Sequence, residues 1–251
     1  MPLRADQRPV RPRRLKELPP GRIAAIIAED PRLIVPIGTC EAHGPHVPLG
    51  CDTLIVEHLA DDLSAEFGVL RAPTVEYGVN ADAAHPSPGN GSVRKKTLHA
   101  LLNDLLASWE ATGVREFILL TAHAHDAHQD ALATVITAEA RVRVVDIFAV
   151  HVADLLSGQT EPLHGDEVDT SLLLYLAPEL VNMRAAQDYS LSPDERRRHR
   201  RGQGTATRRG EPVSRPSLAT AEKGRLLYER IRKQIAARIF APPPVPGPSD
   251  L

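Results

Sequence analysis

The sequence predicts a single-domain α/β protein of three layers, α/β/α, in which helices cover both faces of a largely parallel sheet. Two observations predict this fold. Short apolar runs that end at glycine or at polar clusters alternate with segments of helical periodicity, which is typical of a parallel sheet covered by helices. The chain of 251 residues, 42% of them hydrophobic, is also long enough for one domain to bury a full core.

The first half of the chain contains two expected helices and two expected strands. Residues 21–29 repeat Ile and Ala at helical spacing, and 33–37 is a short apolar run that ends at a glycine, as a buried strand does. A helix is expected over 53–67 and a strand over 69–75. The stretch 77–91 is rich in Gly, Pro and Asn and predicts a long loop, which in a compact domain usually carries function.

The second half continues the alternation, and Gly113 separates its first helix from its first strand. The strand before the second histidine cluster is a continuous apolar run, which predicts burial on both faces. The expected elements are a helix over 97–111, a strand over 116–121, a helix over 129–141, a strand over 142–150, a helix over 168–176 and a last helix over 220–240.

Both ends of the chain and one internal segment differ in composition from this core. Residues 1–20 are rich in Arg and Pro and predict a flexible arm, whereas 21–240 is expected to form the catalytic domain and 241–251 a Pro-rich tail. Within the domain, 190–215 is interpreted as an Arg-rich loop or lid. If its arginine run, 196–201, folds over a pocket, it favours a substrate that carries a carboxylate or phosphate.

Charge and composition exclude several classes of function. The formal net charge of -2 and the 4% of aromatic residues do not suit nucleic-acid binding, and no apolar run reaches the length of a membrane span. We therefore expect a cytoplasmic protein that binds neither nucleic acid nor a membrane. In that reducing setting Cys40 and Cys51 are interpreted as free thiols in or near the functional site.

Two clusters of polar residues follow predicted buried strands. Glu41, His43 and Asp52 lie within one short loop, and His123 and His125 follow the strand at 116–121. Divalent metals bind imidazole nitrogen and carboxylate oxygen, and a pair of metals needs a bridging carboxylate. The pattern therefore predicts a metal centre, although a metal store or a structural site has the same composition.

Four blocks of sequence resemble the creatininase-like amidohydrolases. The resemblance implies the family's α/β fold and a divalent metal centre that activates water against a C–N bond. It also implies a homo-oligomer, a hexamer in many relatives. In chain order the blocks are 37–48 followed by Asp52, 117–126, 164–174 followed by 177–181, and 219–224.

The resemblance assigns metal ligands position by position. It implies that Glu41, Asp52 and His123 hold one metal, and that His43, the same Asp52 and His125 hold a second. Creatininase itself has Glu where this chain has His125. Because an imidazole is softer and neutral, the second position should prefer zinc or iron to manganese, with one or two metals per chain and zinc the expected metal.

The third block supplies the candidate catalytic residues. His164 matches the family's proton-shuttling histidine, and Glu167 is a candidate acid, base or additional ligand. Asp169 is interpreted as a helix cap in preference to a residue that orients a ligand, and His46 as a residue that holds its loop. Three other histidines are interpreted as ordinary polar positions: His85, His128 and His151.

The expected reaction is hydrolysis of an amide or cyclic amide of a small molecule. Creatinine is not the expected substrate, because 158–163 contains no aromatic residue where creatininase has a tryptophan. Thr121, Ala122 and Asp126 also depart from the family's pattern beside the metals. These departures leave two alternatives open: a biosynthetic enzyme that forms or rearranges C–N bonds at the same metal site, and a catalytically silent metal-binding scaffold.

Overall fold

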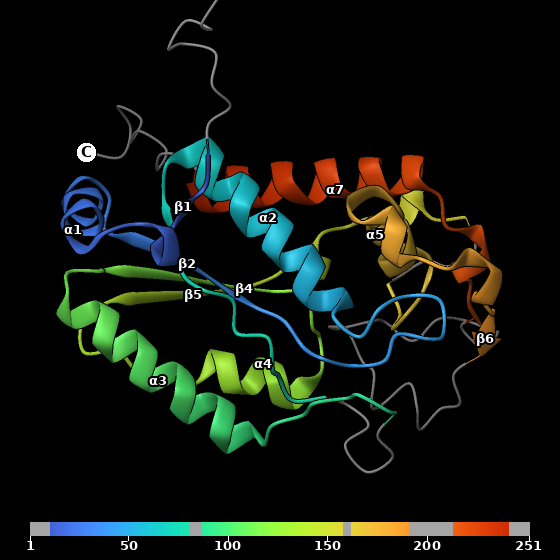
Figure 1. Cartoon of the computed structure of the whole chain (residues 1–251), viewed down its shortest axis with the longest axis horizontal. Coiled ribbons are helices and arrows are strands. Elements are labelled where there is room, and N and C mark those ends of the chain that lie inside the picture. Colours follow the sequence, from blue (N-terminus) through green and yellow to red (C-terminus); the bar gives the residue numbers. More distant parts are fainter. Residues whose placement is uncertain (1–10, 81–86, 158–161, 191–212, 241–251) are drawn as a thin grey trace, which may run out of the picture.

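The computed structural model describes residues 11–80, 87–157, 162–190 and 213–240. This part of the chain forms a three-layer α/β/α domain around a five-stranded sheet with the order β1-β3-β2-β4-β5 (Figure 1). Every pairing in the sheet is parallel, which confirms the predicted fold class. The strands are β1 (Arg13–Arg14), β2 (Arg32–Ile37), β3 (Leu70–Arg71), β4 (Glu116–Thr121) and β5 (Arg141–Asp146).

Helices pack on both faces of this sheet (Figure 1). Core residues of α2, α5 and α7 gather on one face, and core residues of α1, α3 and α4 gather on the other. A short π-helical turn, Ala236–Phe240, extends the last helix. The helices are α1 (Pro20–Glu29), α2 (Cys51–Phe67), α3 (Lys95–Ala111), α4 (Asp126–Ala133), α5 (Glu167–Leu176) and α7 (Ala221–Ile235).

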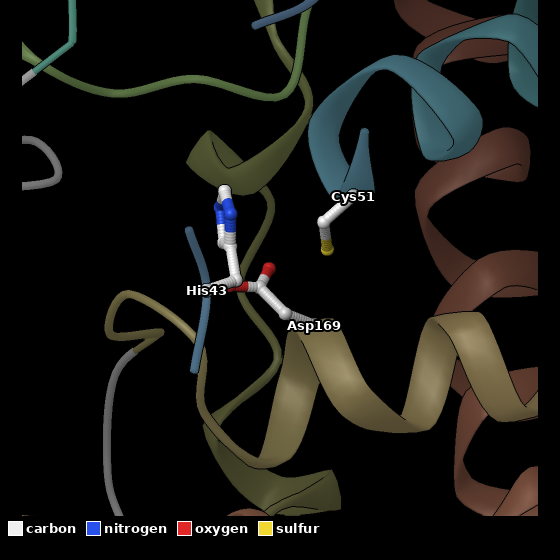
Figure 2. A group of neighbouring side chains, drawn as sticks. All are labelled: His43, Cys51 and Asp169. Atoms are coloured by element: carbon white, nitrogen blue, oxygen red, sulfur yellow. The ribbon is translucent and has the colours of Figure 1, made fainter. Parts of the chain in front are cut away.

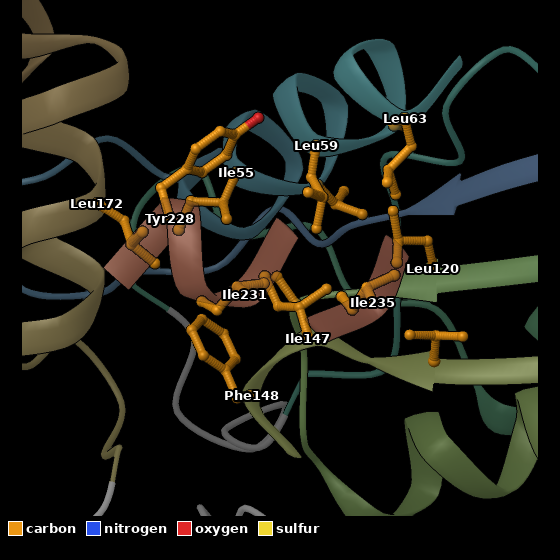
Figure 3. Close-up of a cluster of buried hydrophobic side chains, with 14 of the residues drawn as sticks. Ile55, Leu59, Leu63, Leu120, Ile147, Phe148, Leu172, Tyr228, Ile231 and Ile235 are labelled. Atoms are coloured by element: carbon orange, nitrogen blue, oxygen red, sulfur yellow. The ribbon is translucent and has the colours of Figure 1, made fainter. Parts of the chain in front are cut away.

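The two central strands supply both cores because neighbouring side chains of a strand point to opposite faces. Ile34 and Leu120 pack with α2 and α7, where Figure 3 shows the buried side chains of this face. Leu33 and Phe117 pack on the opposite face with α1 and α3. Burial on both faces explains why β2 and β4 are continuous apolar runs without polar alternation.

The register of β2 and β4 determines where the polar clusters lie. Ile37 pairs with Thr121, so the two strands end side by side. The loop between β2 and α2 and the loop between β4 and α4 therefore leave the same edge of the sheet. Ligand sites of open α/β sheets form at this carboxyl edge.

The N-terminal segment is more ordered than its composition predicts. An arm was expected over 1–20, but Arg13 and Arg14 form β1 at the edge of the sheet. The guanidinium of Arg14 donates hydrogen bonds of 3.0 and 2.7 Å to the two carboxylate oxygens of Asp61 on α2. Because the Arg14 guanidinium is paired with the Asp61 carboxylate, this arginine-rich segment can pack at the edge of the sheet. Residues 191–212 of the loop or lid expected over 190–215, and the tail expected over 241–251, lie outside the described residues.

The helix expected over 129–141 is shorter in the structure, since α4 ends at Ala133. The carboxylate of Glu110 on α3 accepts hydrogen bonds from the main-chain N–H groups of Ala138, Glu139 and Ala140, at 2.6 to 2.9 Å. These contacts hold the segment out of the helix. The strand expected over 142–150 likewise ends at Asp146 and continues as a 3-10 turn. No helix of the described residues is long and apolar enough to cross a membrane.

Gly224 is expected to be intolerant of a side chain. A Cβ at this position of α7 would overlap the main-chain oxygen of Ser171 on α5. Gly224→Ala should therefore destabilise the protein by about 1–3 kcal/mol or more through overpacking, measured as the free energy of unfolding in urea. Gly21→Ala in α1 is the matched control, since nothing lies within 4 Å of its Cβ and alanine favours a helix. Equal stability of Gly224→Ala and the unmodified protein would contradict this packing.

Candidate metal centre

Three segments bring chemically active side chains to the carboxyl edge of the sheet. The loop after β2 carries Glu41 and His43 and runs into α2, whose first turn contains Asp52. The turn between β4 and α4 carries His123. The first turn of α5 contributes Asp169. All five residues are buried, with at most 4% of their surface exposed.

Asp52 lies between two imidazoles. Its Oδ2 atom is 2.9 Å from Nδ1 of His123, and its Oδ1 atom is 3.1 Å from Nε2 of His43. The hydroxyl of Thr39 donates a hydrogen bond of 2.8 Å to Oδ2 and fixes the carboxylate. Each oxygen of one fully buried carboxylate therefore faces one imidazole nitrogen.

The other nitrogen of each imidazole is fixed by the main chain. Nδ1 of His43 donates to the carbonyl of Glu41 at 2.9 Å, and Nε2 of His123 donates to the carbonyl of Val79 at 3.1 Å. A neutral imidazole has a single N–H, so in each ring the nitrogen that faces Asp52 presents a lone pair. A lone pair and a carboxylate oxygen attract each other only through a proton or a cation. Metal-binding histidines are commonly oriented in this way.

In the contact between His43 and Asp52, neither facing atom has a hydrogen bond of acceptable geometry within the described part of the chain. These atoms are Nε2 of His43 and Oδ1 of Asp52. Burial lowers the pKa of His43, but the Asp52 carboxylate outweighs burial and raises that pKa to about 9. Burial raises the pKa of Asp52, whereas His43 and His123 hold it well below its usual range. Without a metal, a proton on His43 therefore compensates for the buried carboxylate.

Glu41, Asp52 and His123 form one potential ligand group. Their ligand atoms all lie within 4.8 Å of one another, and Nδ1 of His123 is 3.6 Å from Oε2 of Glu41. These are the three residues that the family resemblance implies for the first metal. The structure brings them together although 82 positions separate Glu41 from His123, because β2 and β4 end side by side.

A second potential group consists of His43, Cys51 and Asp169 (Figure 2), again with ligand atoms within 4.8 Å of one another. His43 was predicted for the second metal together with His125. His125, at the N-terminus of α4, is half-buried and belongs to neither group among the described residues. Its Nδ1 atom donates to the carbonyl of Val79 at 3.1 Å, which leaves Nε2 as the nitrogen with a lone pair.

His164 lies beside the second group. Its ring centroid is 4.0 Å from that of His43, and its Nε2 atom donates to the carbonyl of Ala42 at 2.8 Å. The hydroxyl of Tyr189 donates to the His164 carbonyl, which fixes the main chain. A neutral imidazole has one N–H, so this hydrogen bond places the proton of neutral His164 on Nε2 and orients the ring.

Glu167 contacts residues away from the two groups. Its buried carboxylate forms an ion pair with Lys223 of α7 and accepts a hydrogen bond of 2.9 Å from the main-chain N–H of Ser157. Lys223 also donates to the hydroxyl of Ser157 and to the carbonyl of Leu218. These contacts tie the N-terminus of α5 to α7.

The interpretation of Asp169 as a helix cap is wrong. Asp166 is the N-cap of α5, and its Oδ1 atom accepts hydrogen bonds from the N–H groups of Val168 and Asp169 at 2.7 and 3.0 Å. Asp169 accepts the N–H of Gly165 at 2.8 Å and lies beside His43. The sequence could have identified Asp166 as the cap, since Asp at the position before a helix is a favoured N-cap residue.

Two further histidines support the site. His46 is buried and hydrogen-bonds to the hydroxyl of Thr170 at 2.8 Å, which holds the loop against α5 as predicted. His128, interpreted from the sequence as an ordinary polar position, is fully buried with its ring edge against His123 at 4.9 Å between centroids. Its Nδ1 accepts the Val79 N–H at 3.3 Å, and burial lowers its pKa well below the usual value. His128 is therefore a neutral residue that positions His123.

A family model described as creatininase (creatinine amidohydrolase) matches residues 16–239 of the chain. The mycofactocin precursor peptide peptidase of Mycolicibacterium smegmatis is 29% identical over 225 residues, which cover 83% of this chain and 84% of that protein. The creatinine amidohydrolase of Pseudomonas putida is 24% identical over 191 residues, or 66% of this chain and 72% of that protein.

The 3-dehydro-scyllo-inosose hydrolase of Thermotoga maritima is 27% identical over 169 residues, which are 62% of this chain. The matched region spans only about half of that hydrolase, 53% of its length. Among solved structures, a crystal structure of creatininase superposes with a TM-score of 0.72 at 21% identity, covering 92% of this chain and 99% of the other. At that identity the likeness establishes the fold alone.

Proposed function

Because the chain belongs to the creatininase family, we propose that it is a metal-dependent hydrolase that cleaves the C–N bond of a small amide with water. One observation carries the proposal: each oxygen of Asp52 faces a nitrogen of a different buried imidazole. A carboxylate in that position is suited to bridge two cations. The names of the relatives, which include an amidohydrolase and a peptidase, support the reaction class.

The donor set fits divalent metals. Glu41, Asp52 and His123 would hold one ion, and His43 with the other oxygen of Asp52 would hold a second. When bound, such ions lower the pKa of water and polarise an amide carbonyl, so that hydrolysis can proceed near neutral pH. Related creatininase structures described as a Zn-Zn type and as an Mn form support the choice of a divalent ion. Zinc remains our expected metal because the ligands are largely imidazole and carboxylate.

His164 would transfer the proton to the departing nitrogen. Its ring packs against that of His43 at an interplanar angle of 34°, so it lies next to the metal centre. Its Nε2 donates to the carbonyl of Ala42, which orients the ring, and the protonated imidazole would act as the general acid. A general acid placed beside the metals, but not coordinated to them, is what amide cleavage requires, because an amine leaves poorly as an anion.

Glu167 is proposed as a positioning residue, in place of its predicted role as an acid, base or ligand. Lys223→Met should cost about 3–5 kcal/mol, because it leaves the fully buried Glu167 carboxylate without its cation. The double variant Lys223→Met/Glu167→Gln should lose less, since the buried charge is removed as well. Chemical unfolding measures both. Loss of bound metal from Glu167→Gln, with stability retained, would instead identify Glu167 as a ligand.

The proposed substrate is an amide or cyclic amide other than creatinine. No aromatic residue is present in 158–163 to stack on a flat ring, although part of this segment lies outside the described residues. Of the three sequence relatives above, the one that matches most of both chains is named as a peptidase, which supports including short peptides among the candidates.

The proposal is tested by a metal-dependent activity screen. The protein is stripped with a chelator and reloaded with zinc, manganese or iron. Release of amine or ammonia is then followed from creatinine, cyclic amides, linear amides and short peptides. We expect hydrolysis of at least one amide class that is lost on chelation and restored by metal. Activity that survives complete removal of metal, or metal-loaded protein that cleaves no amide above the level of His164→Asn, would contradict the proposal.

A further inference from the structure

We propose that Cys51 is a thiolate ligand of the second metal position, together with His43, Asp169 and Oδ1 of Asp52. This position would then have mixed nitrogen, oxygen and sulfur donors and would select a thiophilic ion such as zinc. The inference rests on the proposed function and deepens it, because it identifies which residues of this chain complete the second site.

The geometry brings three ligand types to one point. Cys51 is the first residue of α2, Asp169 lies in the first turn of α5, and His43 lies in the loop between β2 and α2. Figure 2 shows the sulfur of Cys51 and the carboxylate of Asp169 directed toward the same space, with His43 alongside. Their ligand atoms lie within 4.8 Å of one another. Ligands of tetrahedral zinc, bound at about 2.0–2.3 Å, are separated by about 3.3–3.8 Å, so a small contraction is sufficient.

An independent observation points to a cation at this position. Nε2 of His43 lacks a hydrogen bond of acceptable geometry among the described residues, although its side chain is 0% exposed. Its other nitrogen already donates to the Glu41 carbonyl. A buried lone pair without a donor is costly unless a proton or a metal satisfies it.

The close approach of α5 to the His43 loop is built into the backbone. Gly165 has a φ of 64°, and a Cβ there would overlap the main-chain oxygen of His43. Only glycine accepts both the left-handed conformation and this contact. The approach places Asp169 next to His43 and Cys51, and the N–H of Gly165 orients the Asp169 carboxylate.

The charges of the candidate ligands favour Cys51 and Asp169 over His125. Two divalent ions bring four positive charges into a buried site, and Glu41 and Asp52 supply two negative charges. A Cys51 thiolate and the Asp169 carboxylate supply two more, which gives neutrality, whereas an imidazole supplies none. Buried charge needs such compensation. On binding, the thiol proton passes to solvent as the metal–sulfur bond forms.

Cobalt substitution tests the proposal by a readout other than activity. The full-length protein is stripped and loaded with Co²⁺ under anaerobic conditions, and bound cobalt is quantified. We expect two equivalents and a thiolate-to-cobalt charge-transfer band in the near ultraviolet. The band should disappear in Cys51→Ser and in Cys51→Ala. Cys40→Ser is the matched control, because Cys40 contacts the carbonyl of Gly89 outside both groups, and it should retain the band.

The outcomes separate this inference from the proposed function. Cys51 also packs in the hydrophobic core, so thermal unfolding of each variant verifies that it is folded, and Cys51→Ala preserves the apolar character of the position. Cobalt bound without a charge-transfer band, or a band that persists in both Cys51 variants, would overturn the thiolate ligand and leave the metal-dependent hydrolase intact. A wild-type protein that binds no cobalt would overturn both.

Discussion

Asp52→Asn is expected to remove bound metal from both positions and to lower amide hydrolysis by more than about 10³-fold, the upper range for loss of a single stabilising donor from a catalytic site. The reason is that one oxygen of Asp52 faces the imidazole of His43 and the other faces that of His123. An amide presents one acceptor oxygen and no charge, so it cannot bridge two cations. Elemental analysis of the purified variant and its rate on the substrate measure the two effects.

The control for this prediction is Asp126→Asn. Asp126 is exposed at the start of α4 and lies outside both ligand groups, so the control should retain its metal and its rate. Because asparagine has nearly the same shape as aspartate, the fold should survive in both variants, and thermal unfolding verifies it. An Asp52→Asn protein that binds two metals as tightly as wild type would refute the bridging role.

His164→Asn is expected to lower kcat by about 10²–10⁴-fold, the usual contribution of a general acid, while metal content stays unchanged. The ring of His164 packs at a tilt against His43 and its Nε2 donates to a main-chain carbonyl, so its loss should remove a proton donor without removing a ligand. Steady-state kinetics and metal analysis on the same preparation test both parts. His151→Asn, at an exposed position, is the control. Loss of metal together with activity would assign His164 to the ligands instead.

The sequence predicted the parts of the fold that are determined by burial on both faces of the sheet. The strands expected over 33–37 and 116–121 match β2 and β4 almost residue for residue. A parallel strand between two helix layers is a continuous apolar run, so its ends are clear in the sequence. The elements that depend on side chains from elsewhere were not predictable. Glu110 of α3 binds the main chain at 138–140, which keeps this segment out of the expected helix, and Asp61 of α2 pairs with Arg14 of β1.

The same distinction applies to the metal centre. Glu41, Asp52 and His123 could be predicted because they follow strands that a local pattern reveals, and the resemblance to a family aligned them. The proximity of Cys51 and Asp169 to His43 could not be predicted from sequence, because it depends on how α5 packs against the loop at Gly165. The resemblance placed His125 at the second metal; in the structure it belongs to neither ligand group among the described residues, and its Nδ1 donates to the carbonyl of Val79.

Anomalous diffraction from crystals of the zinc-loaded protein, recorded at the zinc absorption edge, tests the bridging role of Asp52 most directly. We predict two peaks, one within about 2.0–2.2 Å of Nδ1 of His123 and the other equally close to Nε2 of His43, each adjacent to a different oxygen of Asp52. A site in which the imidazoles contact Asp52 directly, with no anomalous peak between them after zinc loading, would contradict the metal centre and with it the proposed hydrolase.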